Sequence, residues 1–86
     1  MVDKTLKERE STYGDFSSLS VIANDLKLSM RASDGWIRLE PEHKEALDMI
    51  VHKIARIING DPNHIDSWHD IAGYAMLVED IIKRRL

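Results

Sequence analysis

The chain contains no cysteine, only two prolines and four glycines, and no long apolar run. The lack of cysteine excludes disulfides, thiolate catalysis and cysteine-based zinc sites. No apolar run reaches the roughly 20 residues needed to cross a bilayer, and the polar start MVDKTLKERE is not typical of a secretion signal. The sequence therefore predicts a protein that works in the cytoplasm, away from membranes.

A strong positive charge is also lacking. The net charge is −3, whereas proteins that coat duplex nucleic acid draw their affinity from many Lys and Arg contacts to phosphates. This argues against a duplex-binding protein but leaves room for a local basic patch that holds one small phosphate ligand. A chain of 86 residues has room for one domain with a modest core, so we expect homo-oligomers.

Apolar residues recur at helical spacing in three segments, which predicts an all-α protein with core helices over 15–31, 41–59 and 67–84. The charged residues 1–12 form a short helix or an arm. Because the connection between the last two helices is short, they are expected to form an antiparallel hairpin, and oligomerisation would complete the small bundle.

Several residues mark the expected helix ends and faces. Asp15 is placed to cap the first helix, Pro41 to begin the second, Gly60 to end it and Asp66 to cap the third. Three apolar sets are expected to face inward: Phe16, Leu19, Ile22, Ala23, Leu26 and Met30; Leu47, Ile50, Ile54, Ile57 and Ile58; and Trp68, Ile71, Tyr74, Ala75, Val78 and Ile82. The connection after the first helix would pack through Trp36, Ile37 and Leu39.

A polar stripe runs along the helix over 41–59, between Glu45 and Arg56. Its second half holds His52, Lys53 and Arg56, which could neutralise an anion, since Arg offers a fork to phosphate and Lys a point charge. The plainer alternative is a solvated helix face with local contacts. A binding role requires that a neighbouring segment or subunit encloses this stripe.

Carboxylates offer a second kind of site. Glu42, Glu45 and Asp48 form an ExxExxD run that could hold Mg²⁺ if Asp66 or Asp70 faces it, although a solvated acidic helix turn looks the same. Asp70 lies at the edge of the apolar stripe, where a carboxylate needs a partner, a proton or a metal. A hydrogen-bonded structural aspartate is the ordinary interpretation.

The stretch HIDSWHD and the aromatic residues leave further alternatives. His69 and Asp70, with His64 and Asp66, could bind a transition metal, but Asp66 is expected to be engaged in capping. Aromatic side chains could stack on a base or belong to the core: Tyr13, Trp36, Trp68 and Tyr74. Gly73 inside a helix suggests the close approach of another helix or a ligand.

Three blocks, RESTYGDF, EALDMIVHKIARIINGDP and DSWHDIAGYAMLVED, resemble a family of small uncharacterised proteins of tailed phages and prophages, from about Lys7 to Asp80. More distantly, the chain is similar to phage nucleotide-modification-associated domains and to MazG-like all-α nucleotide pyrophosphatases. That resemblance implies magnesium held by paired acidic motifs. Glu42 and Glu45 match the first pair, whereas Asp66 and Asp70 replace the second with a four-residue spacing.

The leading hypothesis is a phage-encoded protein that binds a nucleotide or nucleotide-derived signal, sequestering a second messenger of host defence, with no cofactor or with Mg²⁺. The expected ligand-binding residues are Tyr13, Trp36, His52, Lys53, Arg56, His69, Asp70 and Tyr74. The alternative is a magnesium-dependent pyrophosphohydrolase, with metal on Glu42, Glu45 and Asp70 and catalysis by Glu45, Asp48 and Asp70. A third possibility is an inhibitor that covers a host protein with its helical surface.

Overall fold

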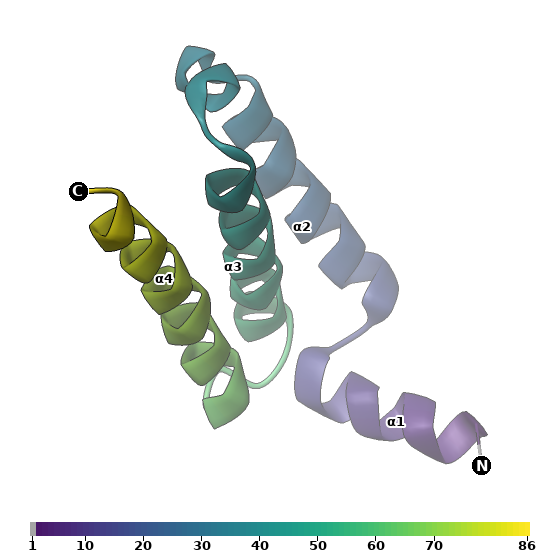
Figure 1. Ribbon diagram of the computed structural model, residues 1–86. Coiled ribbons are helices and arrows are strands. Elements are labelled where there is room, and N and C mark those ends of the chain that lie inside the picture. Colours follow the sequence, from purple (N-terminus) through teal and green to yellow (C-terminus); the bar gives the residue numbers. More distant parts are fainter. Residues whose placement is uncertain (1) are drawn as a thin grey trace.

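The computed structural model describes residues 2–86 as helices and short connections, with no strand in that range (Figure 1). The elements are α1 (Val2–Tyr13), α2 (Phe16–Arg31), the 3-10 helix η1 (Asp34–Arg38), α3 (Pro41–Asn59) and α4 (Ile65–Arg85). The predicted all-α class is confirmed. None of these helices is long and apolar enough to cross a membrane.

The helix ends follow local capping chemistry, with one exception. The Asp15 carboxylate accepts the backbone N–H of Ser18 at 3.0 Å, so the predicted cap of α2 is confirmed. Pro41 begins α3 as predicted. The predicted cap of α4 is wrong, because the helix begins at Ile65 and Asp66 lies inside its first turn. The negative charge of Asp66 there still stabilises the helix through its dipole.

The three longest helices lie side by side, with α3 between α2 and α4 (Figure 1). Residues 60–64 join α3 to α4 in the expected antiparallel hairpin, and α1 runs across the end of α2 and α3 where that connection lies. The central helix buries small side chains, Ala46, Val51 and Ala55, because a helix with two neighbours gains from close approach.

The apolar core is thin for a chain of this length. Its centre is Leu19, Ala23 and Ala55, and no large side chain is fully buried in the part of the chain that the structure describes. The radius of gyration is 14.9 Å, compared with roughly 12 Å for a compact domain of this length. The fold is therefore open and elongated.

Several side chains expected to face inward are instead exposed. They are Phe16, Ile37, Leu47, Ile58, Trp68, Ala75 and Ile82. The reason is architectural, since a single layer of helices covers each helix on one or two sides and leaves the rest of its apolar stripe open. Trp36 and Leu39 are partly covered, as predicted for the connection around η1.

Candidate functional site

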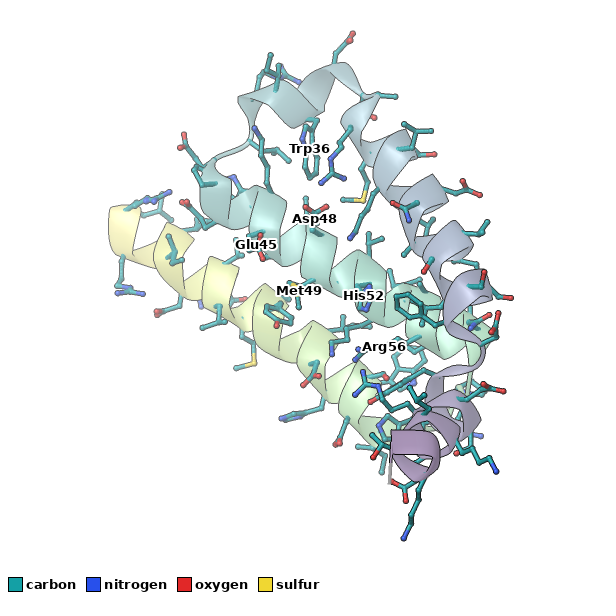
Figure 2. The ribbon with its side chains drawn as sticks, turned by 90° about the vertical axis from the view of Figure 1, so that its right-hand side faces the viewer. Trp36, Glu45, Asp48, Met49, His52 and Arg56 are labelled. Atoms are coloured by element: carbon teal, nitrogen blue, oxygen red, sulfur yellow. The ribbon has the colours of Figure 1, made fainter. Side chains whose placement is uncertain are left out.

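A partly enclosed hollow lies where α1 crosses α2 and α3. This pocket, the α1 pocket, has a volume of about 280 Å³. Its lining residues are Leu6, Arg9, Glu10, Tyr13, Gly14, Asp15, Phe16, Leu19, His52 and Arg56. Figure 2 shows His52 and Arg56 along α3 toward this end of the molecule, and Trp36 at the opposite end of the α2 and α3 pair.

The turn between α1 and α2 is fastened to the end of α3, and this places the pocket. The Asp61 N–H donates to the Thr12 carbonyl at 2.7 Å. Gly14 adopts φ +81°, a left-handed conformation that glycine adopts without strain. A Cβ atom at Gly14 would lie only 2.2 Å from the Asn59 carbonyl oxygen. Gly60 lies equally close to Thr12 and Tyr13. Two glycines thus let the turn and the end of α3 touch.

Two guanidinium groups converge on the ring of Tyr13 in the α1 pocket. Arg56 lies 4.3 Å and Arg9 5.6 Å from the ring centroid, and His64 meets the ring edge-on at 5.6 Å. A stacked guanidinium keeps its N–H donors at its edge, where they can bind an anion. Since both guanidinium groups lie against this ring, a base that stacks on Tyr13 would compete with them for its faces.

His52 is the titratable group most affected by this environment. Burial lowers the pKa of its imidazole below 6.5, and the positive charges of Arg56, Lys27 and Lys53 lower it further. Three cations therefore surround a partly buried imidazole. Such a site holds a positive potential that an anionic ligand would neutralise.

Carboxylates at the α1 pocket balance this charge only in part. Asp15 is engaged with the backbone N–H and the hydroxyl of Ser18, at 3.0 and 3.1 Å. Among residues 4–86, whose side chains the structure describes, no carboxylate forms an ion pair with Arg9 or Arg56. Glu10 is the remaining acidic residue of the lining. The lining thus holds two guanidinium groups and two carboxylates, and one of these carboxylates is already engaged at the start of α2.

Lys53 of α3 pairs with Asp70 of α4, so it lies on the side of α3 that faces α4. The Lys53 ammonium is 3.0 Å from the Asp70 carboxylate, and the lysine side chain is only 12% exposed. The partner expected for Asp70 is thus a lysine. The predicted phosphate trio is divided, because His52 and Arg56 line the α1 pocket whereas Lys53 joins two helices and acts on His52 only through its charge.

The acidic run of α3 is spread over separate contacts. Asp48 pairs with Arg31 at 2.8 Å and Glu42 pairs with Arg85, while Glu45 is exposed. The pKa of Glu42 is lowered, first by its own backbone N–H in the opening turn of α3, with Arg85 adding to the effect. Among the described residues, no group of three or more histidine and carboxylate side chains is close enough to hold a metal ion.

The other expected ligand residues lie outside the α1 pocket. Trp36 packs against Arg31, whose guanidinium is 5.1 Å from the ring centroid. His69, Asp70 and Tyr74 border an open groove on α4. The expected close approach at Gly73 does not occur within the chain, since a Cβ atom there would meet nothing within 4 Å.

The sequence interpretation missed the contribution of α1, namely Leu6, Arg9 and Glu10. A signal was present: Arg9 and Tyr13 are four residues apart, so a helix places them on the same side. Lys27 of α2 was also missed, because its effect on His52 depends on how α2 and α3 pack.

Comparison with known proteins adds one finding to this geometry. Searches of the curated proteins and of the solved structures find no match to the chain. A family model does match nearly its whole length, over residues 2–82. The chain belongs to the family described as a domain of unknown function, DUF6378.

Proposed function

We propose that the α1 pocket binds a phosphate-bearing ligand, a nucleotide or a nucleotide-derived signal molecule, and does not cleave it. The observation that carries this proposal is the convergence of Arg9, His52 and Arg56 from two helices on one hollow. The two guanidinium groups supply donors for phosphate oxygens. The pKa of His52 is lowered by burial first, and the positive charges of Arg56, Lys27 and Lys53 lower it further.

The walls of the pocket suit a ligand with a charged and an apolar part. Leu6, Phe16 and Leu19 line it together with the cations, and Phe16 is 76% exposed although it is aromatic. Ligand pockets typically have about 300–1,000 Å³, so a hollow of 280 Å³ suits the phosphates and part of the nucleoside. We assign the base to the ring of Phe16 at the mouth, in place of Tyr13 or Trp36.

Binding without cleavage is favoured by the state of the carboxylates. Magnesium-assisted cleavage needs several carboxylates around one metal, but Asp48 and Asp70 each pair with a cation on a different side of α3. The resemblance to small phage proteins supports sequestration of a host second messenger as the purpose of binding.

Isothermal titration calorimetry with pyrophosphate, nucleoside triphosphates and cyclic dinucleotides tests the proposal. Wild-type protein should bind at least one of these compounds, and Arg56→Gln should weaken that binding by about tenfold or more, since a charge-assisted hydrogen bond is lost. The matched control is Arg38→Gln, in the exposed turn η1.

The same panel distinguishes the other functions. If the protein releases pyrophosphate from a nucleotide, and if this release requires Mg²⁺ and is lost in Glu45→Ala, the protein is a pyrophosphohydrolase and not only a binding protein. If no compound binds, or if Arg56→Gln and wild type bind equally well, the proposed site is wrong. Recovery of one host protein by the nucleotide-free chain would then favour an inhibitor of that protein.

A further inference from the structure

An open groove lies on α4 around Gly73. Its lining consists of His69, Asp70, Gly73, Tyr74, Met76, Leu77 and Asp80. Met76 and Leu77 are 67% and 62% exposed, and a Cβ atom at Gly73 would meet no atom within 4 Å. Figure 1 shows α4 at the edge of the helix layer, with α3 beside it on one side only. An apolar notch thus lies on an uncovered helix face.

The chain exposes more surface than a compact monomer of its mass, and this surplus is large enough for an interface between two copies. The chain exposes 6443 Å², whereas a compact monomer of its 9.9 kDa mass exposes roughly 5,200 Å². The surplus of about 1,200 Å² exceeds the roughly 800 Å² that each partner buries in a standard interface. The open layer therefore has enough surplus surface for a stable dimer.

The charges of α4 select the direction in which a second α4 would pack. The helix carries Asp66 in its first turn and Lys83, Arg84 and Arg85 in its last turn. At 100° per residue, Asp66, Gly73, Leu77 and Arg84 fall on one face within about 40°. Two such faces that pack antiparallel bring the acidic start of each helix to the basic end of the other, whereas parallel packing sets like charges together.

We propose that a second copy of this chain docks on the α4 face in antiparallel orientation, with the side chain of Leu77 in the Gly73 notch of the partner subunit. Gly73 and Leu77 are equally far from Ala75 along the helix, as are Asp66 and Arg84. A two-fold axis at the level of Ala75 therefore satisfies both contacts in both copies, as a symmetric dimer requires.

Sedimentation equilibrium of the full chain measures this dimer. Wild type should dimerise, and Gly73→Gln should raise the dimer dissociation constant by about tenfold or more by filling the notch. The space beside Gly73 is open in one chain, so this variant should keep the helical circular dichroism of wild type. Ala75→Gln is the matched control, because Ala75 is exposed and lies roughly 160° around the helix from Leu77.

A charge exchange and a cross-link provide readouts that do not depend on Gly73→Gln. Asp66→Arg and Arg84→Asp should each weaken the dimer, and the variant with both changes should recover it.

Since the chain has no cysteine, a mixture of Gly73→Cys and Leu77→Cys proteins should form a mixed disulfide dimer on oxidation. A wild-type monomer at roughly 100 µM, well above typical dimer dissociation constants, or a dimer that Gly73→Gln leaves intact, overturns the proposal.

Discussion

The side-chain amide of Asn59, the last residue of α3, donates hydrogen bonds to the carbonyl oxygens of both Tyr13 and Asp15, at 2.9 Å each. These two carbonyls flank Gly14, so one amide holds both sides of the turn between α1 and α2. The α1 pocket lies beside this turn, with Tyr13 and Asp15 in its lining. The position of α1, and with it the position of Arg9, depends on this contact.

Asn59→Ala should lower the free energy of unfolding by about 1–3 kcal/mol, because two carbonyls lose their donor in a partly covered place. Urea unfolding followed by circular dichroism measures this change. Asn63→Ala is the control, since Asn63 lies exposed in the next connection and the bond it makes to Asp61 uses its backbone N–H. Equal stability of the two variants would show that the two hydrogen bonds of the Asn59 amide contribute nothing to the free energy of unfolding.

Gly14→Ala and Gly60→Ala should each cost roughly 2 kcal/mol or more of unfolding free energy. A methyl group at Gly14 would overlap the Asn59 backbone and strain a left-handed residue, and one at Gly60 would overlap the backbone of Thr12 and Tyr13. Gly35→Ala should be much milder, because its Cβ atom would meet only the end of the Arg38 side chain, at 3.4 Å. Thermal unfolding of the three variants checks this order.

His52 should make the stability of the chain depend on pH. Its pKa in the folded chain lies below 6.5, through burial first and then through nearby cations. As the pH falls below 6.5, the unfolded chain therefore binds this proton more readily than the folded chain does, and the free energy of unfolding decreases. Above 6.5 both states are neutral at His52 and this loss vanishes.

His52→Gln removes this contribution and leaves the other histidines in place. Urea midpoints between about pH 7.5 and pH 5 should therefore fall more steeply for wild type than for His52→Gln. Parallel curves for the two proteins would contradict the environment described for His52.

Lys53→Met tests whether the ligand binds in the α1 pocket or between α3 and α4. The Lys53 and Asp70 pair is partly exposed, so its loss should cost about 1 kcal/mol or less of unfolding free energy. Calorimetry should show a much smaller loss of phosphate affinity in Lys53→Met than in Arg56→Gln, because Lys53 acts on the pocket only at a distance. A loss as large as that of Arg56→Gln would place the ligand between α3 and α4.

The helices could be predicted because their signals are local. Asp15, Pro41 and Gly60 end or begin helices through their own backbone and side-chain chemistry. The buried faces were less predictable. Phe16 and Trp68 satisfy the helical spacing of a core and yet are exposed, since spacing shows only that a helix has an apolar side. Whether another helix covers that side depends on how the layer is assembled.

Only part of the candidate site could be predicted from the sequence. His52 and Arg56 could be paired from the sequence because one helix turn separates them. The separation of Lys53 from that pair was not evident, because it depends on α4 approaching the other side of α3. The contribution of Arg9 requires α1 to cross α3, a contact that depends on the Gly14 turn and the Asn59 amide.

The most direct test of an anion site in the α1 pocket is the pKa of His52, measured from its imidazole proton shifts by NMR with and without saturating pyrophosphate. We expect a pKa below 6.5 in the free protein, through burial first and then through the nearby cations. In the complex the pKa should rise, because the negative charge of the ligand offsets these cations and favours the protonated imidazole. A pKa for His52 that stays the same while pyrophosphate binds would place the anion elsewhere and contradict an anion site in the α1 pocket.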